Sequence, residues 1–220
     1  GQALECQGPG KTIRGIYVAG GNPVNSVADQ TAILRGLVRE DLFTVVHERF
    51  LTDTAKYADM ILPATFSVEQ SDVSSAYGYC TFGHMRKVLD APGECRSNWN
   101  TVCTLAKAMG YEDGFFRQTE EELVEDLLAH PQEGLAGLTD EDWKRLREGG
   151  VVSVPYANHG DFRTPDGKFR IVDESLPVPV PCYQEPYGGA ELLRLVMVPD
   201  LHTLNSIFLE RKDLVERRGK

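Results

Sequence analysis

The sequence predicts a mixed α/β fold built around a parallel β-sheet. Two apolar runs that are rich in β-branched residues, 13–18 and 42–47, indicate buried strands. Between them, apolar residues recur at helical spacing over residues 28–40. A strand, a helix and a second strand this close in the chain form a β-α-β unit, and such a unit joins two parallel strands.

A third strand of the same sheet is predicted shortly afterwards. Thr52 can begin a short helix that extends to Tyr57, and residues 59–62 form an apolar run that ends at a proline. Residues 64–96 contain glycines and a proline without a clear period, so we expect them to be irregular.

Three helices are predicted after this irregular stretch. Ser97 is a suitable N-cap for the first, which we expect to end at Gly110. Thr119 and Thr139 each precede an acidic residue by three positions, which is the pattern of a capping box at the start of an amphipathic helix.

The composition changes after Gly149. Residues 150–200 hold more than half of the twelve prolines of the chain, and they include three short β-type runs, at 151–154, 169–172 and 192–198. We therefore expect a linker that leads into an all-β segment. Residues 208–220 are predicted to form a helix.

Charge and hydropathy exclude two classes of function. The chain has 33 acidic and 23 basic residues and a formal net charge of −10, whereas binding to nucleic acid or to an anionic membrane needs a basic surface. No apolar stretch approaches the length that spans a bilayer, so neither membrane insertion nor nucleic-acid binding is expected. Most of the negative charge lies in residues 112–148, which we interpret as solvated helix faces.

No catalytic or metal-ligating set is expected from the residue pattern. The five cysteines are widely spaced and include no Cys-x-x-Cys pair. Cys80, His84 and Cys95 match no zinc-ligand spacing, and reduced buried thiols are the simpler interpretation.

The best candidate for a binding site is the carboxyl edge of the predicted parallel sheet, where ligands of such sheets bind. Gly21, Asn22 and Ser26 follow the first strand, and their backbone and side chains could meet an anion at a helix start. His47 and Glu48 follow the second strand, where an acidic residue can bind ribose hydroxyls. The sequence Gly20-Gly21-Asn22-Pro23 could equally form an ordinary turn, because neither a G-x-G-x-x-G motif nor a Walker lysine is present.

Several motifs, in this order, resemble the molybdopterin oxidoreductase family, which includes formate dehydrogenases and periplasmic nitrate reductases. The resemblance covers about residues 13–210. Its motifs are IYVAGGNP at 16–23, VVHERFLTDTA at 45–55, YADMILPA at 57–64, Glu69, RSNW at 96–99, FRTPDGKF at 162–169 and HTLNSIF at 202–208.

The resemblance implies a fold in two parts. Residues 1–150 would form a Rossmann-like α/β/α domain that binds molybdopterin guanine dinucleotide. Residues 151–220 would form a linker and the first part of a C-terminal β-barrel domain that also binds the cofactor. In the family, a molybdenum or tungsten ion is held by two such dinucleotides, with guanosine ends at the strand ends.

The resemblance also implies roles for individual residues. Asp53, Thr54 and Asp59 would hold the short helix and the third strand in register. Asn98 stands where the family often has Asp, and an amide can still both donate to and accept from a guanine edge. The cofactor contacts implied are Gly21, Asn22 and Ser26 to phosphate and ribose, His47 and Glu48 to ribose or base, Asn98 to guanine, and His202 and Asn205 to a pterin.

We therefore expect a cofactor-binding fragment of a molybdenum or tungsten oxidoreductase that is inactive alone. The family's 4Fe-4S cluster, metal ligand and substrate pocket would precede this segment. Its partners would be the remainder of the oxidoreductase polypeptide and electron-transfer subunits. The compartment would be the cytoplasm, or the periplasm if a Tat signal precedes the chain. Two alternatives stay open: an α/β interaction or assembly module without cofactor, and an ordinary mononucleotide-binding domain.

Overall fold

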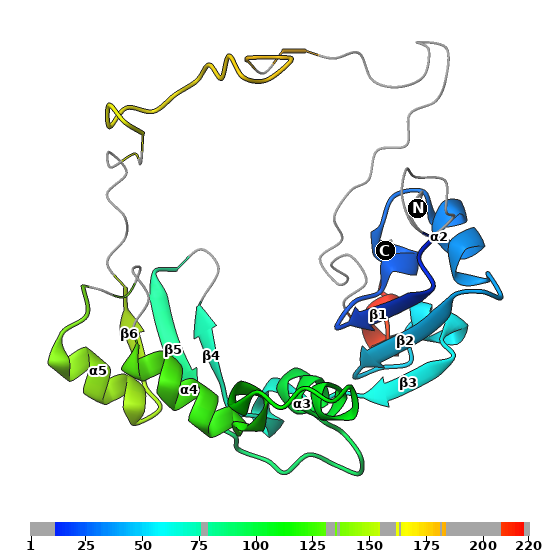
Figure 1. Ribbon diagram of the computed structural model, residues 1–220, viewed down its shortest axis with the longest axis horizontal. Helices are drawn as coiled ribbons and strands as arrows, with labels where there is room; N and C mark the ends of the chain where they lie inside the picture. Colours follow the sequence, from blue (N-terminus) through cyan, green and yellow to red (C-terminus); the bar gives the residue numbers. More distant parts are fainter. Residues whose placement is uncertain are drawn as a thin grey trace.

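The computed structural model contains two separate three-stranded sheets with helices against them (Figure 1). It describes residues 12–75, 79–130, 135, 137–154, 162, 164–180, 182–183 and 208–217. The described residues therefore show a mixed α/β fold with a parallel sheet, as the sequence predicts.

The first sheet is parallel and follows the order of the chain. Strands β1 (Gly15–Ala19), β2 (Phe43–Glu48) and β3 (Met60–Pro63) lie in the order β1-β2-β3. Helices α1 (Pro23–Ser26) and α2 (Gln30–Leu37) connect β1 to β2, and the 3-10 helix η1 (Thr54–Tyr57) connects β2 to β3. All three predicted strands are confirmed to within a few residues.

A small apolar core joins α1 and α2 to one face of this sheet. Val24, Ile33, Leu37 and Leu42 are buried together, and Ile16 of β1 packs against them. Helix α2 starts later than its periodicity suggests because Asp29 acts as its N-cap, with its side chain accepting a hydrogen bond from the Ala32 amide.

Helix α3 (Asn98–Ala108) begins where the sequence predicts it. The Ser97 hydroxyl accepts a hydrogen bond from the Asn100 amide at 3.1 Å, as an N-cap does. Just before it, Arg96 forms an isolated parallel bridge with Ala64, so the chain that enters α3 adds to the sheet on the β3 side.

The second sheet is antiparallel, and most of it lies where irregular structure is expected. Strands β4 (Asp72–Ser75), β5 (Thr81–Met85) and β6 (Val151–Ser153) lie in the order β4-β5-β6. The expectation of an irregular 64–96 is therefore wrong. Strand β4 reads Asp-Val-Ser-Ser, which has weak β-propensity, and its sheet is completed only by a strand much later in the chain.

Helices α4 (Glu120–Ala129) and α5 (Asp140–Arg147) pack against this second sheet. Their shared core contains Val124, Leu128, Leu146 and Val152. Both helices begin at the predicted capping boxes, on Thr119 and Thr139. Strand β6 lies just beyond the predicted domain boundary at residue 150, and the boundary itself stays a prediction.

The remaining elements are short. They are η2 (Ser67–Glu69), η3 (Gly114–Arg117) and α6 (Lys212–Val215), the last being shorter than the helix predicted over 208–220. The strand predicted at 169–172 is wrong, because these residues pair with no described strand and Ile171 is 71% exposed. The run at 192–198 lies outside the described residues, within which no closed barrel is present. No described helix is both long and apolar enough to cross a bilayer.

Candidate functional site

The carboxyl ends of the parallel strands surround a small pocket of about 150 Å³. Gly20, directly after β1, has a positive φ of 56° that turns the chain away from the sheet at the pocket rim. Three predicted site residues, His47, Glu48 and Asn98, line this pocket, and Gly21 adjoins it in the chain. The other lining residues are Arg49, Ala64, Thr65, Ser67 and Gln70.

His47 is completely buried and connects three segments. Its Nε2 lies 3.0 Å from the Arg96 carbonyl oxygen, so this nitrogen carries the hydrogen and donates it. Its Nδ1 lies 2.9 Å from the Tyr17 hydroxyl and accepts from it. Burial raises the pKa of Tyr17, which keeps the hydroxyl a donor. Because both ring nitrogens have protein partners, His47 shapes the pocket and offers it no free nitrogen.

Glu48 places a carboxylate in the wall of the pocket. Its side chain is only 9% exposed, and Oε1 accepts a hydrogen bond from the Arg49 amide at 2.7 Å. Within the described part of the chain, no hydrogen bond reaches its second oxygen. A buried carboxylate is costly unless donors surround it. Glu48 is therefore well placed to accept hydrogen bonds from a ligand.

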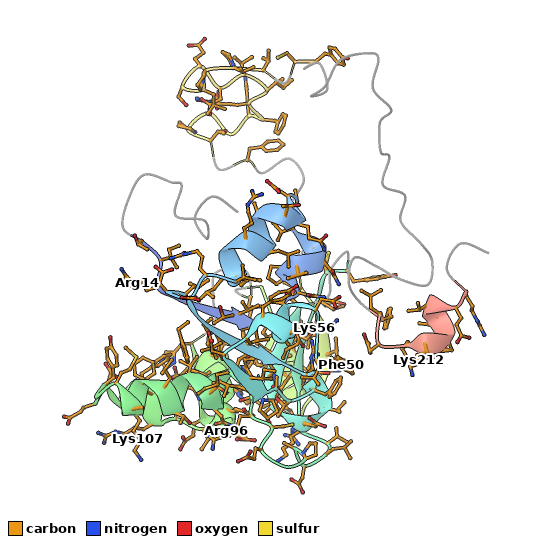
Figure 2. All side chains as sticks on the ribbon, turned by 90° about the vertical axis from the view of Figure 1, so that its right-hand side faces the viewer. Arg14, Phe50, Lys56, Arg96, Lys107 and Lys212 are labelled. Carbon is orange, nitrogen blue, oxygen red and sulfur yellow. The ribbon has the colours of Figure 1, made fainter. Side chains whose placement is uncertain are left out.

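Arg49 supplies a positive charge that the sequence analysis missed. Its Nε lies 3.7 Å from Glu48 Oε1, and its guanidinium lies 5.3 Å from the centre of the Phe66 ring. Phe50, labelled in Figure 2, packs edge-on against Phe66. Its position in the sequence could have indicated Arg49, because this residue directly follows a strand whose carboxyl end faces the site.

Asn22 and Ser26 make internal contacts rather than facing the pocket. Asn22 is 8% exposed, and its Oδ1 accepts hydrogen bonds from the Thr54 hydroxyl at 2.7 Å and the Thr54 amide at 3.2 Å. The Ser26 hydroxyl donates to the Asn22 carbonyl oxygen. These bonds join the loop after β1 to η1, which gives Asn22 a clear structural role.

The start of α3 is fixed by a carboxylate from the other half of the chain. Glu120 accepts hydrogen bonds from the Ser97 hydroxyl, from the Asn100 side-chain amide at 3.1 Å and from the Ser71 backbone amide at 3.2 Å. Asn98 lies exposed in the first turn of α3, beside this network. Sequence reasoning missed Glu120, because only the folded chain brings it to Ser97.

The last two predicted contacts, His202 and Asn205, lie outside the described residues. In the part of the chain that is described, no group of three His, Cys, Asp or Glu side chains is arranged to hold a metal ion. The candidate site is the pocket at the carboxyl edge of the sheet, with Gly20, His47, Glu48, Arg49 and Asn98 among its lining residues.

A parallel sheet with a glycine turn and a polar pocket at its strand ends is typical of cofactor-binding α/β domains. Residues 3–108 match the family model for molybdopterin oxidoreductase. This match confirms the resemblance to the molybdopterin oxidoreductase family that the sequence motifs predict. This family implies a molybdenum or tungsten molybdopterin cofactor.

Individual relatives agree with this assignment. The probable oxidoreductase YoaE of Bacillus subtilis is 34% identical over 74% of this chain and 24% of its own length. The F420-dependent formate dehydrogenase subunit alpha of Methanocaldococcus jannaschii is 34% identical over 64% of this chain and 20% of its own length.

A solved structure shares the fold. Acetylene hydratase from Pelobacter acetylenicus matches 84% of this chain and 25% of its own, with a TM-score of 0.66 and 22% sequence identity. The chain thus spans about a quarter of the length of YoaE and of acetylene hydratase.

Proposed function

We propose that this chain is the part of a molybdopterin oxidoreductase that holds one guanosine arm of a molybdopterin guanine dinucleotide. The arm would bind in the pocket at the carboxyl ends of β1 and β2. The observation that supports this most strongly is Glu48, whose side chain is 9% exposed and whose second oxygen accepts no hydrogen bond from a described residue.

A guanosine can supply the hydrogen-bond donors that the second oxygen of Glu48 does not find among the described residues. Guanine carries an N1 hydrogen and an exocyclic amino group side by side, and ribose adds two hydroxyls. Either pair can hydrogen-bond to one carboxylate. The amide of Asn98, on the other side of the pocket, can donate to the guanine carbonyl oxygen or accept from its amino group. Adenine, whose Watson–Crick edge has an acceptor at N1, fits this carboxylate less well.

The phosphates would lie outside the pocket. The volume of about 150 Å³ is roughly that of five water molecules, so it suits a base or a sugar and not a whole dinucleotide. Gly20 and Gly21 have no bulky side chains to keep a phosphate from the backbone. The Arg49 side chain, 42% exposed, supplies a cation at the same rim.

The chemistry divides between the cofactor and the protein. When bound, the metal and its pterins would supply the redox chemistry, and this chain's residues would bind and orient them. The 4Fe-4S cluster and the metal ligand belong, in this proposal, to other parts of the oxidoreductase. We expect the 220-residue chain by itself to bind a guanosine nucleotide and to turn over no substrate.

Calorimetric titration of GMP and AMP into the chain tests the proposal. We expect GMP to bind more tightly than AMP, and Glu48→Gln to weaken GMP at least about tenfold, equivalent to about 1.4 kcal/mol. Glu40→Gln is the matched control, because it removes the same charge from an exposed position before β2. Equal affinity for GMP and AMP would favour an ordinary mononucleotide site. No binding of either at several millimolar would favour an interaction module.

A further inference from the structure

Asn98 lies in a tightly held turn at the start of α3, but its own side chain is unpaired. It lines the candidate pocket, and within the described part of the chain its side-chain amide has no hydrogen-bond partner. The residues before and after it are held by hydrogen bonds to two different parts of the fold. The direction in which this amide faces a ligand is therefore set by its neighbours in the chain.

The parallel sheet holds the residue two positions before Asn98. The Arg96 backbone amide donates to the Pro63 carbonyl oxygen at 3.0 Å. The Arg96 carbonyl oxygen accepts from the Thr65 amide at 3.2 Å and from His47 Nε2 at 3.0 Å. These contacts fix the chain beside β3, but they end at residue 96. The first turn of α3 needs a second support to fix the direction in which it leaves the sheet.

The start of α4 supplies this second support, and Figure 1 shows α3 between the parallel sheet and α4. Glu120 Oε1 accepts hydrogen bonds from the Ser97 hydroxyl and from the Asn100 side-chain amide, the latter at 3.1 Å. Trp99 Nε1 donates to a carbonyl oxygen two residues before Glu120, at 2.8 Å. Residues on both sides of Asn98 are thus bound to the segment that begins α4.

Glu120 is itself held by the antiparallel half of the chain. It is the first residue of α4, whose Val124 and Leu128 are buried in the core of the second sheet. Its Oε2 accepts a hydrogen bond at 3.2 Å from the backbone amide of Ser71, directly before β4. One carboxylate therefore connects the second sheet to the turn that carries Asn98.

We infer, building on the proposed guanosine site, that Glu120 is a positioning residue for base recognition. It holds the first turn of α3 so that the Asn98 amide meets the guanine edge. A hydrogen-bonding group of a binding site recognises its ligand only when it is held within about 0.5 Å of the productive geometry. Without the Glu120 carboxylate, the Ser97 hydroxyl and the Asn100 amide would lose their shared acceptor, and the turn would be held less precisely.

A purely structural role for Glu120 makes a different prediction. A carboxylate near a helix N-terminus is favourable through the helix dipole alone, wherever the neighbouring side chains point. Such a residue would change the free energy of unfolding and leave the GMP affinity of the folded chain as it was. A positioning residue acts through Asn98, so its effect on GMP binding disappears when the Asn98 amide is removed.

A double-mutant cycle with calorimetric GMP titrations of the chain tests the inference. Glu120→Ala should weaken GMP binding at least about fivefold, the equivalent of one hydrogen bond, and should have no effect in an Asn98→Ala background. Glu121→Ala is the matched control. It removes the neighbouring charge from the same turn of α4, and its carboxylate bonds to the Ser71 hydroxyl and not to α3, so GMP affinity should not change.

Two further variants separate the reach of the side chain from its charge. Glu120→Asp keeps the charge but shortens the side chain by one methylene, so it should weaken GMP binding as Glu120→Ala does. Glu120→Gln keeps the reach and one acceptor oxygen without the charge, so its GMP affinity should lie within about twofold of the original. Circular dichroism of each variant distinguishes a weaker site from an unfolded chain.

The outcomes distinguish this inference from the proposed function. If the original chain binds GMP and Glu120→Ala and Glu120→Asp bind it equally well, the inference is wrong and the guanosine site stands. The same holds if these variants weaken GMP binding equally with and without the Asn98 amide, or if Glu120→Gln is as weak as Glu120→Ala. If the original chain binds no GMP, the guanosine site and the inference are both refuted.

Discussion

The buried hydrogen bonds between Asn22 and Thr54 should contribute measurably to stability. Thr54 is completely buried, and its hydroxyl donates to Asn22 Oδ1 at 2.7 Å while accepting from the Val24 amide at 3.2 Å. Thr54→Val keeps the shape of the side chain and removes both bonds. It also leaves the Val24 amide buried without an acceptor.

The magnitude follows from these contacts. Each lost hydrogen bond costs about 1 kcal/mol, and an unpaired buried amide adds about 1–3 kcal/mol. The additional methyl group of valine returns about 0.8 kcal/mol. The net expectation for Thr54→Val is a loss of about 2–4 kcal/mol in the free energy of unfolding, or roughly 4–16 °C in Tm for a chain of this size.

Urea unfolding measures this change, with a shifted midpoint at an unchanged slope. Ser26→Ala is the control, because its exposed hydroxyl contacts only the Asn22 carbonyl oxygen, and we expect a loss below about 0.5 kcal/mol. In a double-mutant cycle, Asn22→Ala and Thr54→Val should couple by about 1 kcal/mol or more. A Thr54→Val chain within about 0.5 kcal/mol of the original, or additive effects in the cycle, would refute the structural role of Asn22.

Two other substitutions test separate contacts. Ser97→Ala removes the N-cap of α3 and a hydrogen-bond donor to Glu120, so it should lower the free energy of unfolding in urea by about 1–2 kcal/mol. Ser175→Ala, at an exposed turn, is the control and should change this free energy little. The pKa of Asp53 in the folded chain is lowered, first by the hydrogen bond from Lys56 and then by the one from Asn25. The Asp53 carboxylate therefore stabilises the fold at pH values above its pKa in the unfolded chain, and this stabilisation is lost as the pH falls through its pKa in the folded chain. Asp53→Asn should therefore flatten the acid side of the stability–pH curve, and an unchanged curve would contradict this.

Local patterns predicted much of the fold because they depend on neighbouring residues. Capping at Ser97, Thr119 and Thr139 involves side chains and amides three residues apart, and all three caps are present. The antiparallel sheet could not be predicted in this way. Its pairing of Gly83 with Val151 joins segments far apart in sequence, and only the second segment, within the predicted β-type run at 151–154, carries a strand signal.

The position of the candidate site could be predicted from the sequence, whereas the directions in which its side chains point could be predicted less well. His47 and Glu48 line the pocket because they lie at the carboxyl end of β2, and Asn98 joins them because the chain that enters α3 bridges to Ala64 beside β3. Whether Asn22 turns toward a ligand or toward Thr54 depends on packing that no local pattern encodes. The same limit applies to Glu120, whose partners come from segments 20 to 50 residues away.

The central claim, a guanosine site at the carboxyl edge of the parallel sheet, is tested most directly by NMR mapping of GMP on the ¹⁵N-labelled chain. We expect the amide shifts to concentrate at Gly20, Gly21, Glu48, Arg49 and Asn98, and to disappear in Glu48→Gln. Shifts centred instead on the larger groove beside α3, which Lys107 and Arg117 line, would contradict the account. An unchanged spectrum at several millimolar GMP would contradict it equally.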